Sequence, residues 1–192
     1  MDSIDLLRQA YAWTADRIAN VRPDDLQNPT PCAGWTLADL LNHLLGAIDI
    51  HTQAISGTAI EMTLDELEAL PHTDRIGDDP AAAFDATTQR ALAAWNAPGA
   101  LDRVCHMPFG PMAASLLAIL DLSEVVVHGW DIGQATHRPV DVPDALAAAV
   151  LDSAAPLVEL QRGVAYGPAV TDAGTSATQR LVAYFGRKPV TA

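Results

Sequence analysis

The stretch that decides the fold is LSEVVVHGWD, residues 122–131, which lies inside the longer run 113–135. This run is almost wholly apolar and contains no proline, so it predicts a long helix that is apolar nearly all round. Glu124 and His128 are four residues apart and would share one face of that helix. Such a helix belongs inside the protein, where an ionisable pair needs a partner that compensates for its lost hydration. A divalent metal ion is one such partner.

A second predicted helix carries a matching polar line. Residues 36–56 place leucine, isoleucine and alanine around most of the helix, with Thr36 as the N-cap. Its few polar residues form one narrow stripe: Asp39, Asn42, His43 and Asp49. The helix at 113–135 has its own stripe: Asp121, Glu124, His128 and Asp131. If the two stripes face each other inside a bundle, His43, Glu124 and His128 converge.

Two imidazoles and one carboxylate suit zinc first, and also nickel, iron or manganese. Zinc with three protein ligands keeps a fourth position open for water or substrate. Asp39 lies one turn before His43, and Asp131 one turn after His128, so these carboxylates are candidates to hold the remaining ring nitrogens. The alternative interpretation is that both stripes are ordinary solvent-exposed faces and that the Glu/His pair contributes little energy. No catalytic residue can be singled out.

The rest of the chain predicts further helices at 3–21, 80–95, 144–161 and 176–186. A turn-rich connection at 57–79 holds at most a short helix at 63–70, and residues 101–112 predict a short extended segment with a turn. This order is typical of an all-α four-helix bundle with a long crossover after the second helix and extra helices at the C-terminus. We expect residues 1–192 to form one domain.

The composition excludes several classes of protein. Apolar residues make up 49% of the chain and charged residues 18%, which excludes intrinsic disorder. The net charge of −13 would repel nucleic acids and anionic membranes. No segment approaches the roughly 20 uninterrupted apolar residues that span a bilayer, and the first residues do not form a signal peptide. We therefore expect a cytoplasmic protein that binds neither nucleic acid nor membrane.

Several other residues have two possible interpretations. Cys32 is either a small buried residue in a proline-rich turn or a reactive thiol before a helix N-terminus, and the first is favoured. Cys105-His106 is a weak candidate for a second metal site, and Arg90 and Arg103 are candidates to bind a carboxylate-bearing substrate. Three histidines are expected at the surface or in helix caps: His51, His72 and His137.

Three motifs together resemble the DinB/YfiT-like metal-binding superfamily. They are PTPCAGWTLADLLNH at 29–43, EVVVHGWDIGQA at 124–135 and LVAYFGRKP at 181–189. The resemblance is strongest to actinobacterial metal-binding proteins related to the N-terminal domain of mycothiol-dependent maleylpyruvate isomerase. It implies a four-helix bundle, a metal held by His43, Glu124 and His128, and a homodimer.

The resemblance also implies a class of reaction. Characterised members are isomerases or transferases that use a thiol cofactor, namely mycothiol, bacillithiol or glutathione, and act on a small electrophile. The metal would activate the thiol by lowering its pKa. The alternative is a non-catalytic metal- or small-ligand-binding protein on the same bundle, with a role in stress response. The two differ in whether any substrate is turned over.

Overall fold

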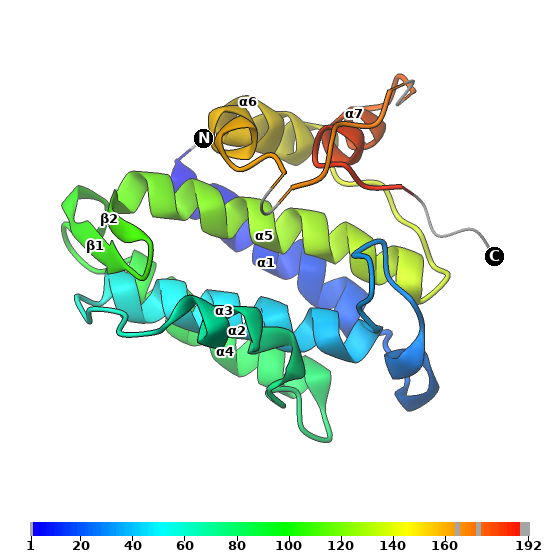
Figure 1. Cartoon of the computed structure of the whole chain (residues 1–192), viewed down its shortest axis with the longest axis horizontal. Coiled ribbons are helices and arrows are strands. Elements are labelled where there is room, and N and C mark those ends of the chain that lie inside the picture. Colours follow the sequence, from blue (N-terminus) through cyan, green and yellow to red (C-terminus); the bar gives the residue numbers. More distant parts are fainter. Residues whose placement is uncertain (1, 164–165, 172–173, 189–192) are drawn as a thin grey trace.

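The computed structural model describes residues 2–163, 166–171 and 174–188, and these residues form an all-α bundle, as predicted. The body of the bundle is four long helices: α1 (Ser3–Ile18), α2 (Leu37–Ile55), α4 (Pro80–Trp95) and α5 (Ala114–Ala135). Helix α5 packs between α1 and α2, and α4 packs between the same two helices on the other side. The consecutive helices α1 and α2 therefore lie diagonally across the bundle (Figure 1).

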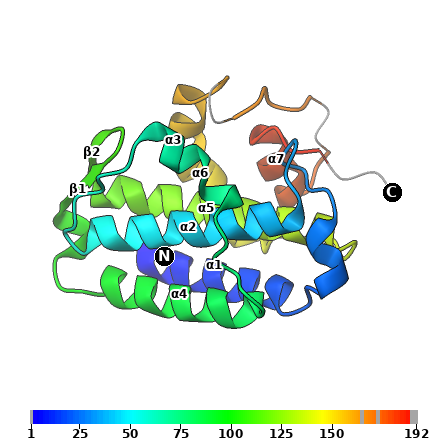
Figure 2. The same cartoon turned by 60° about the horizontal axis from the view of Figure 1, so that its bottom comes forward.

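A long crossover connects α2 to α4, as the sequence predicts. It holds the short helices α3 (Leu64–Glu68) and η2 (Leu70–His72), and it runs along α2 (Figure 2). The other connections contain η1 (Pro23–Gln27), η3 (Ala100–Asp102) and an antiparallel hairpin of β1 (Val104–Met107) and β2 (Gly110–Ala113). The hairpin corresponds to the extended segment expected at 101–112.

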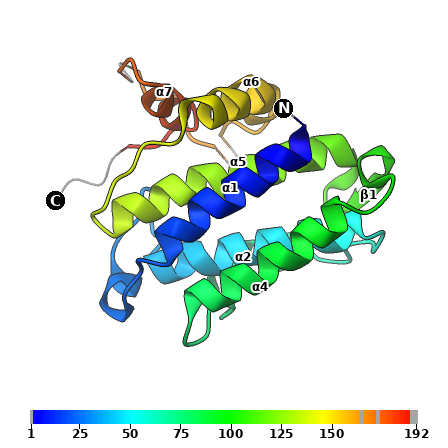
Figure 3. The ribbon, with the colours of Figure 1, turned by 180° about the vertical axis from the view of Figure 1, so that it is seen from behind.

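Two further helices follow the bundle, α6 (Asp144–Leu160) and α7 (Ala177–Tyr184). Helix α6 packs on α5, and α7 packs on α6. Figure 1 and Figure 3 show both on the side of α5 away from α2 and α4. The predicted helix boundaries agree with the structure to within three residues. Helix α5 consequently has neighbours on most of its circumference, which explains its apolar sequence.

The start of α2 is fixed by reciprocal hydrogen bonds between Thr36 and Asp39. The backbone N–H of Asp39 donates to Thr36 Oγ1 at 3.2 Å, and Asp39 Oδ2 accepts from the backbone and the hydroxyl of Thr36 at 2.9 and 2.7 Å. This capping box satisfies N–H groups that the first turn leaves without helical partners. It also sets the helical phase that turns His43, one turn later, toward α5.

Helices α1 and α5 approach each other closely at Gly129. A Cβ atom there would overlap the hydroxyl oxygen of Thr14 and lie 2.6 Å from the ring of Trp13, well inside van der Waals contact. One turn earlier on α5, the backbone oxygen of Val125 accepts a hydrogen bond from the hydroxyl of Thr14 at 3.0 Å.

Although α5 is the most apolar of the four long helices, none of the helices in the described residues is long and apolar enough to cross a membrane.

The centre of the bundle holds a buried carboxylate, Asp121, which is fully inaccessible to solvent. Its oxygens accept hydrogen bonds from the Tyr11 hydroxyl at 2.6 Å and the Trp95 indole at 3.0 Å, and contact His51 Nδ1 at 3.1 Å. One side chain of α5 thus joins α1, α4 and α2. The expectation that His51 lies at the surface or in a helix cap is wrong. This histidine is buried against Asp121, which the sequence placed on the polar stripe of the helix at 113–135 without a partner.

Candidate metal centre

Three side chains converge between α2 and α5. Nε2 of His43 lies 3.2 Å from Glu124 Oε2, and Nε2 of His128 lies 3.1 Å from the same oxygen. The spacing of four residues brings Glu124 and His128 together on α5, and the packing of α2 against α5 supplies His43. The side chains are 22%, 18% and 7% exposed for His43, Glu124 and His128, so the cluster is largely sheltered from solvent and still reachable.

The donor set fits a divalent metal ion. Its three ligand atoms lie within 4.8 Å of one another. Atoms that bind one tetrahedral zinc ion at about 2.0–2.2 Å lie ~3.3–3.6 Å apart, close to the two measured separations. Small side-chain movements would therefore suffice to admit a cation. Two imidazoles and one carboxylate are also the donor types that zinc and its first-row neighbours prefer.

Aromatic rings border the cluster. The ring of Trp35 lies 4.7 Å from that of His43 and 6.4 Å from that of His128, centre to centre. The two imidazoles meet edge to face at 5.2 Å. Trp35 belongs to the turn-rich segment before α2, so this segment places an apolar wall against the two histidines.

Asp131 contacts the other ring nitrogen of His128. Its Oδ2 lies 2.9 Å from Nδ1, and Asp131 is fully buried. This is the contact that the sequence predicts for Asp131. When His128 is neutral, a carboxylate on Nδ1 keeps the proton on that nitrogen and leaves the Nε2 lone pair available to a cation.

Asp39 has a different position from the one expected. Its Oδ2 belongs to the capping box with Thr36, and its Oδ1 lies 3.2 Å from Nδ1 of the exposed His72. Burial acts to raise the pKa of Asp39, but the hydrogen bonds from Thr36 and His72 outweigh it and lower this pKa. Its carboxylate oxygens are thus engaged at the start of α2, and the hydrogen bonds give no support for a role in holding His43.

Cys32 lies beside His128, on the side of the ring away from Glu124. Its Sγ is 3.5 Å from Asp131 Oδ2 and 4.0 Å from His128 Nδ1. Cys32, His128 and Asp131 form a second group with ligand atoms within 4.8 Å of one another. Arg187 forms an ion pair with Asp131, and its positive charge would repel a cation bound to this second group. The second group is therefore a poorer cation site than the group of His43, Glu124 and His128.

Arg187 is a site residue that sequence reasoning missed. Its Nε donates to both oxygens of Asp131, at 3.1 and 3.3 Å. Burial acts to lower the pKa of Arg187, but the negative charge of Asp131 raises it. The only signal in the sequence was the motif at 181–189, which indicates relatedness without giving the arginine a role. No spacing rule connects residues 56 positions apart.

Tyr166 also lies near the cluster and was not anticipated. Its ring packs edge to face on Phe185 at 5.4 Å. Burial raises the pKa of Tyr166, the charge of Glu124 raises it further, and Arg187 partly opposes this. The phenol is therefore neutral and can donate a hydrogen bond.

Glu124 and His128 have pKa values shifted in opposite directions. Burial acts to raise the pKa of Glu124, but hydrogen bonds from His128 and His43 outweigh it and hold this pKa well below its usual range. Burial acts to lower the pKa of His128, but its hydrogen bonds with Asp131, Cys32 and Glu124 raise it well above the usual range. Without a cation, both shifts favour the charged forms of the pair, a carboxylate and an imidazolium.

The remaining candidates from the sequence lie elsewhere. Cys105 is buried on β1, and His106, the next residue, is exposed on the opposite face of the strand, so the two cannot share an ion. Arg90 pairs with Asp49 at 2.8 Å, and Arg103 donates to the backbone oxygen of Ile55 at 2.6 Å. Neither arginine reaches the cluster.

Comparisons with known proteins identify the family. The family described as the mycothiol maleylpyruvate isomerase N-terminal domain matches residues 7–133, which contain all three clustered donors. Two relatives come from Mycobacterium tuberculosis, the uncharacterized proteins MT0763 of strain CDC 1551 and Rv0738 of strain H37Rv. Each is 30% identical over 158 residues, covering 82% of this chain and 80% of the relative.

Solved structures show the same fold. The crystal structure of a mycothiol-dependent maleylpyruvate isomerase superposes with a TM-score of 0.61 at 17% identity, covering 81% of this chain and 68% of that one. A histidine-to-alanine variant of that isomerase has a TM-score of 0.59 at the same identity and coverage. The chain is thus a DinB-like bundle and belongs to the family of mycothiol maleylpyruvate isomerase N-terminal domains.

Proposed function

We propose that this chain binds a divalent metal ion through His43, Glu124 and His128, and that the metal serves a thiol-dependent isomerase or transferase acting on a small electrophile. The observation that carries the proposal is the convergence of two imidazole Nε2 atoms on one carboxylate oxygen, at 3.2 and 3.1 Å. The family supports mycothiol, or a similar low-molecular-weight thiol, as the cofactor. Zinc is the first candidate metal, and the same donors accept nickel, iron or manganese.

A divalent cation at this cluster would lower the pKa of a bound thiol and so supply a thiolate at neutral pH. Asp131 orients His128 by contacting Nδ1, and Arg187 holds Asp131 in that position. Trp35 covers the rings of His43 and His128 and limits access of water from its side. The chain's own residues thus position the donors and keep the site partly dry.

Metal content provides the first test. Protein purified without an affinity tag is analysed for its elements, before and after addition of Zn²⁺, Ni²⁺, Fe²⁺ or Mn²⁺. We expect close to one bound ion per chain and its loss in His128→Ala. His106→Ala removes an exposed histidine far from the cluster and serves as the matched control. A metal content near zero that no cation restores, or an unchanged content in His128→Ala, would contradict the proposed site.

Thiol binding and turnover provide the second test. Calorimetric titration of the metal-loaded protein with mycothiol, bacillithiol and glutathione should reveal binding of at least one of them, and this thiol should be consumed or recycled with an electrophile. Metal binding with no thiol binding and no turnover would instead indicate a non-catalytic metal-binding protein on the same bundle.

A further inference from the structure

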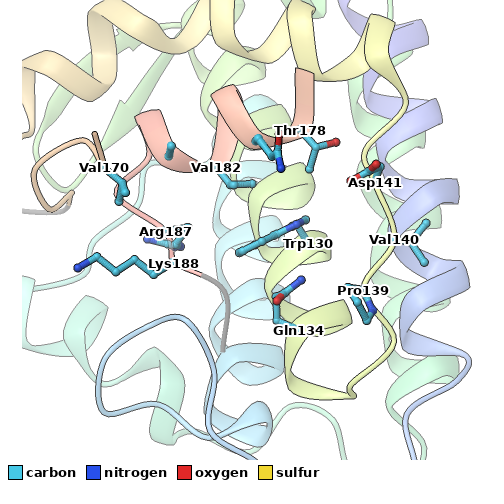
Figure 4. Close-up of a pocket in the computed structure, with 12 residues that line it drawn as sticks. Trp130, Gln134, Pro139, Val140, Asp141, Val170, Thr178, Val182, Arg187 and Lys188 are labelled. Carbon is cyan, nitrogen blue, oxygen red and sulfur yellow. The ribbon is translucent and has the colours of Figure 1, made fainter. Parts of the chain in front are cut away.

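A cavity of about 630 Å³ lies between the C-terminal half of α5, the segment 139–141 and α7, and Arg187 on its lining connects it through Asp131 to the cluster of His43, Glu124 and His128. Figure 4 shows Trp130 and Gln134 projecting from α5 between α7 and that segment. The side chains that line the cavity do not include His43, Glu124 or His128, so it is distinct from the donor cluster. Its volume falls in the range of roughly 300–1,000 Å³ typical of small-molecule sites.

The charges around this cavity differ from those of the whole chain. Arg187 and Lys188, from the segment after α7, line one side, and Asp141 lies on the other side (Figure 4). Two cations and one carboxylate line the cavity, and when Asp131, the buried ion-pair partner of Arg187, is included the charges sum to zero, whereas the chain carries −13 and has Lys188 as its one lysine. A cavity without net negative charge, with two cations on one side, accepts a small anion more readily than the rest of this acidic surface does.

Arg187 can bind an anion without leaving Asp131. Only its Nε donates to Asp131, at 3.1 and 3.3 Å, and no hydrogen bond joins its two terminal NH₂ groups to another residue in the part of the chain that the structure describes. A guanidinium has five N–H donors in a fixed fork, which suits a second carboxylate. Lys188 is exposed on a flexible side chain and can add a second positive charge.

Apolar and aromatic side chains also line the cavity. Trp130 and Val182 are 6% and 5% exposed, and Val170 and Ala183 line the cavity as well, with Val170 beside Arg187 (Figure 4). We propose that the cavity binds an organic carboxylate, with its anionic group on Arg187 and Lys188 and its planar or apolar body against Trp130 and Val182. This site goes beyond the metal-dependent function, because binding there does not require the cation.

The test uses two probes of the same shape, naphthalene-2-carboxylate and the neutral naphthalene-2-carboxamide. Each is titrated into the full chain while the indole N–H signal of Trp130, assigned with Trp130→Phe, is followed by NMR. The titrations are run on chelator-treated and on metal-reconstituted protein. We expect the carboxylate to shift the Trp130 signal saturably in both forms and the carboxamide to bind at least tenfold more weakly.

Charge variants sharpen the result. Lys188→Gln and Arg187→Gln should each weaken carboxylate binding several-fold and leave carboxamide binding unchanged. Arg8→Gln, an exposed residue of α1, makes the same change in net charge away from the cavity and should have no effect. Because Arg187→Gln also removes the ion pair with Asp131, Lys188→Gln keeps the test valid if the other variant fails to fold.

Three results would overturn the proposal: equal affinity for both probes, no shift of the Trp130 signal at millimolar carboxylate, or binding confined to the metal-reconstituted protein. The last would mean that the carboxylate ligates the cation. Since the titration of chelator-treated protein needs no metal, a failure of the metal proposal and a failure of this one can be distinguished.

Discussion

His128 is contacted at both ring nitrogens by carboxylates, and the two contacts have different roles. Asp131 at Nδ1 is fully buried and shares its charge with Arg187, so it acts as a fixed orienting group. Glu124 at Nε2 is partly exposed and also faces His43, so it can exchange its hydrogen bonds for a cation.

The raised pKa of His128 predicts that metal binding releases a proton. A raised pKa in the folded state means that the charged imidazole stabilises the fold below its unfolded pKa, and that this contribution is lost as the pH rises through the folded value. A metal ligand must be neutral, so cation binding at neutral pH should displace about one proton. Calorimetry in buffers of different ionisation enthalpy measures this number. A value near zero would mean that His128 is already neutral.

Asp131→Asn should weaken metal binding by about 10–100-fold, because outer carboxylates orient the histidine and raise its basicity. The amide also loses the ion pair with Arg187. Competition with a chromophoric chelator measures the affinity. Asp152→Asn, on the exposed face of α6, makes the same substitution away from the cluster and should leave the affinity unchanged. Equal affinities for both variants would exclude an orienting role for Asp131.

At the scale of elements, the site depends on how closely α5 is held by its neighbours. Helix α2 supplies His43, and α1 packs on another face of α5 through the contact at Gly129. Glycine has no side chain and so allows α1 and α5 to approach this closely. The hydrogen bond from the Thr14 hydroxyl to the backbone oxygen of Val125 stabilises the same interface. The position of Glu124 and His128 relative to α2 follows from both interfaces.

Gly129→Ala should destabilise the protein by about 1–3 kcal/mol, because the added methyl group must displace the Thr14 hydroxyl and the ring of Trp13 or move α1. The gain in helix propensity, about 1 kcal/mol, offsets only part of this. Urea unfolding of the two chains gives the difference. The control is Gly167→Ala, where a Cβ would meet no atom within 4 Å. If both substitutions had the same effect, the close contact would not be limiting.

At the scale of the whole molecule, the side chain of Asp121 on α5 contacts each of the other three bundle helices. Burial, and then the charge of Asp121, raise the pKa of Tyr11 well above its usual value, so Tyr11 stays a neutral donor. Trp95 and His51 supply the other contacts. Asp121 lies on α5 one turn before Glu124. It therefore stabilises the packing of the helices that carry His43, Glu124 and His128, and is not itself one of these three clustered residues.

Asp121→Asn should cost about 3–5 kcal/mol of stability, because it removes a buried charge that three partners have been arranged to meet. The amide group of asparagine would also face donors on one side. Thermal and urea unfolding measure the loss, with Asp152→Asn as the exposed control. The fraction that remains folded should keep its metal content, since Asp121 contributes no ligand to the cluster. A parallel loss of metal at full stability would contradict a purely structural role.

The sequence predicted most of the helices and the core of the site for local reasons. Caps such as Thr36 and the apolar stripes of α2 and α5 act within a few residues, and the spacing of Glu124 and His128 places both on one face. Asp131 was assigned to His128 on the same ground. Asp39 was assigned to His43 on that ground too, but it is engaged by Thr36 and His72 instead, because a spacing of one turn does not decide which partner a carboxylate takes.

The sequence by itself therefore determined the all-α bundle and the long crossover, and it singled out His43, Glu124 and His128, which the structure brings together. Only the tertiary structure decided that His51 is buried on Asp121, that Cys32 lies beside His128, and that Arg187 holds Asp131 and borders a separate cavity. The physical reason is range. Helical periodicity and capping act over one or two turns, whereas these contacts join residues 56 to 96 positions apart and depend on how whole helices and the C-terminal segment pack.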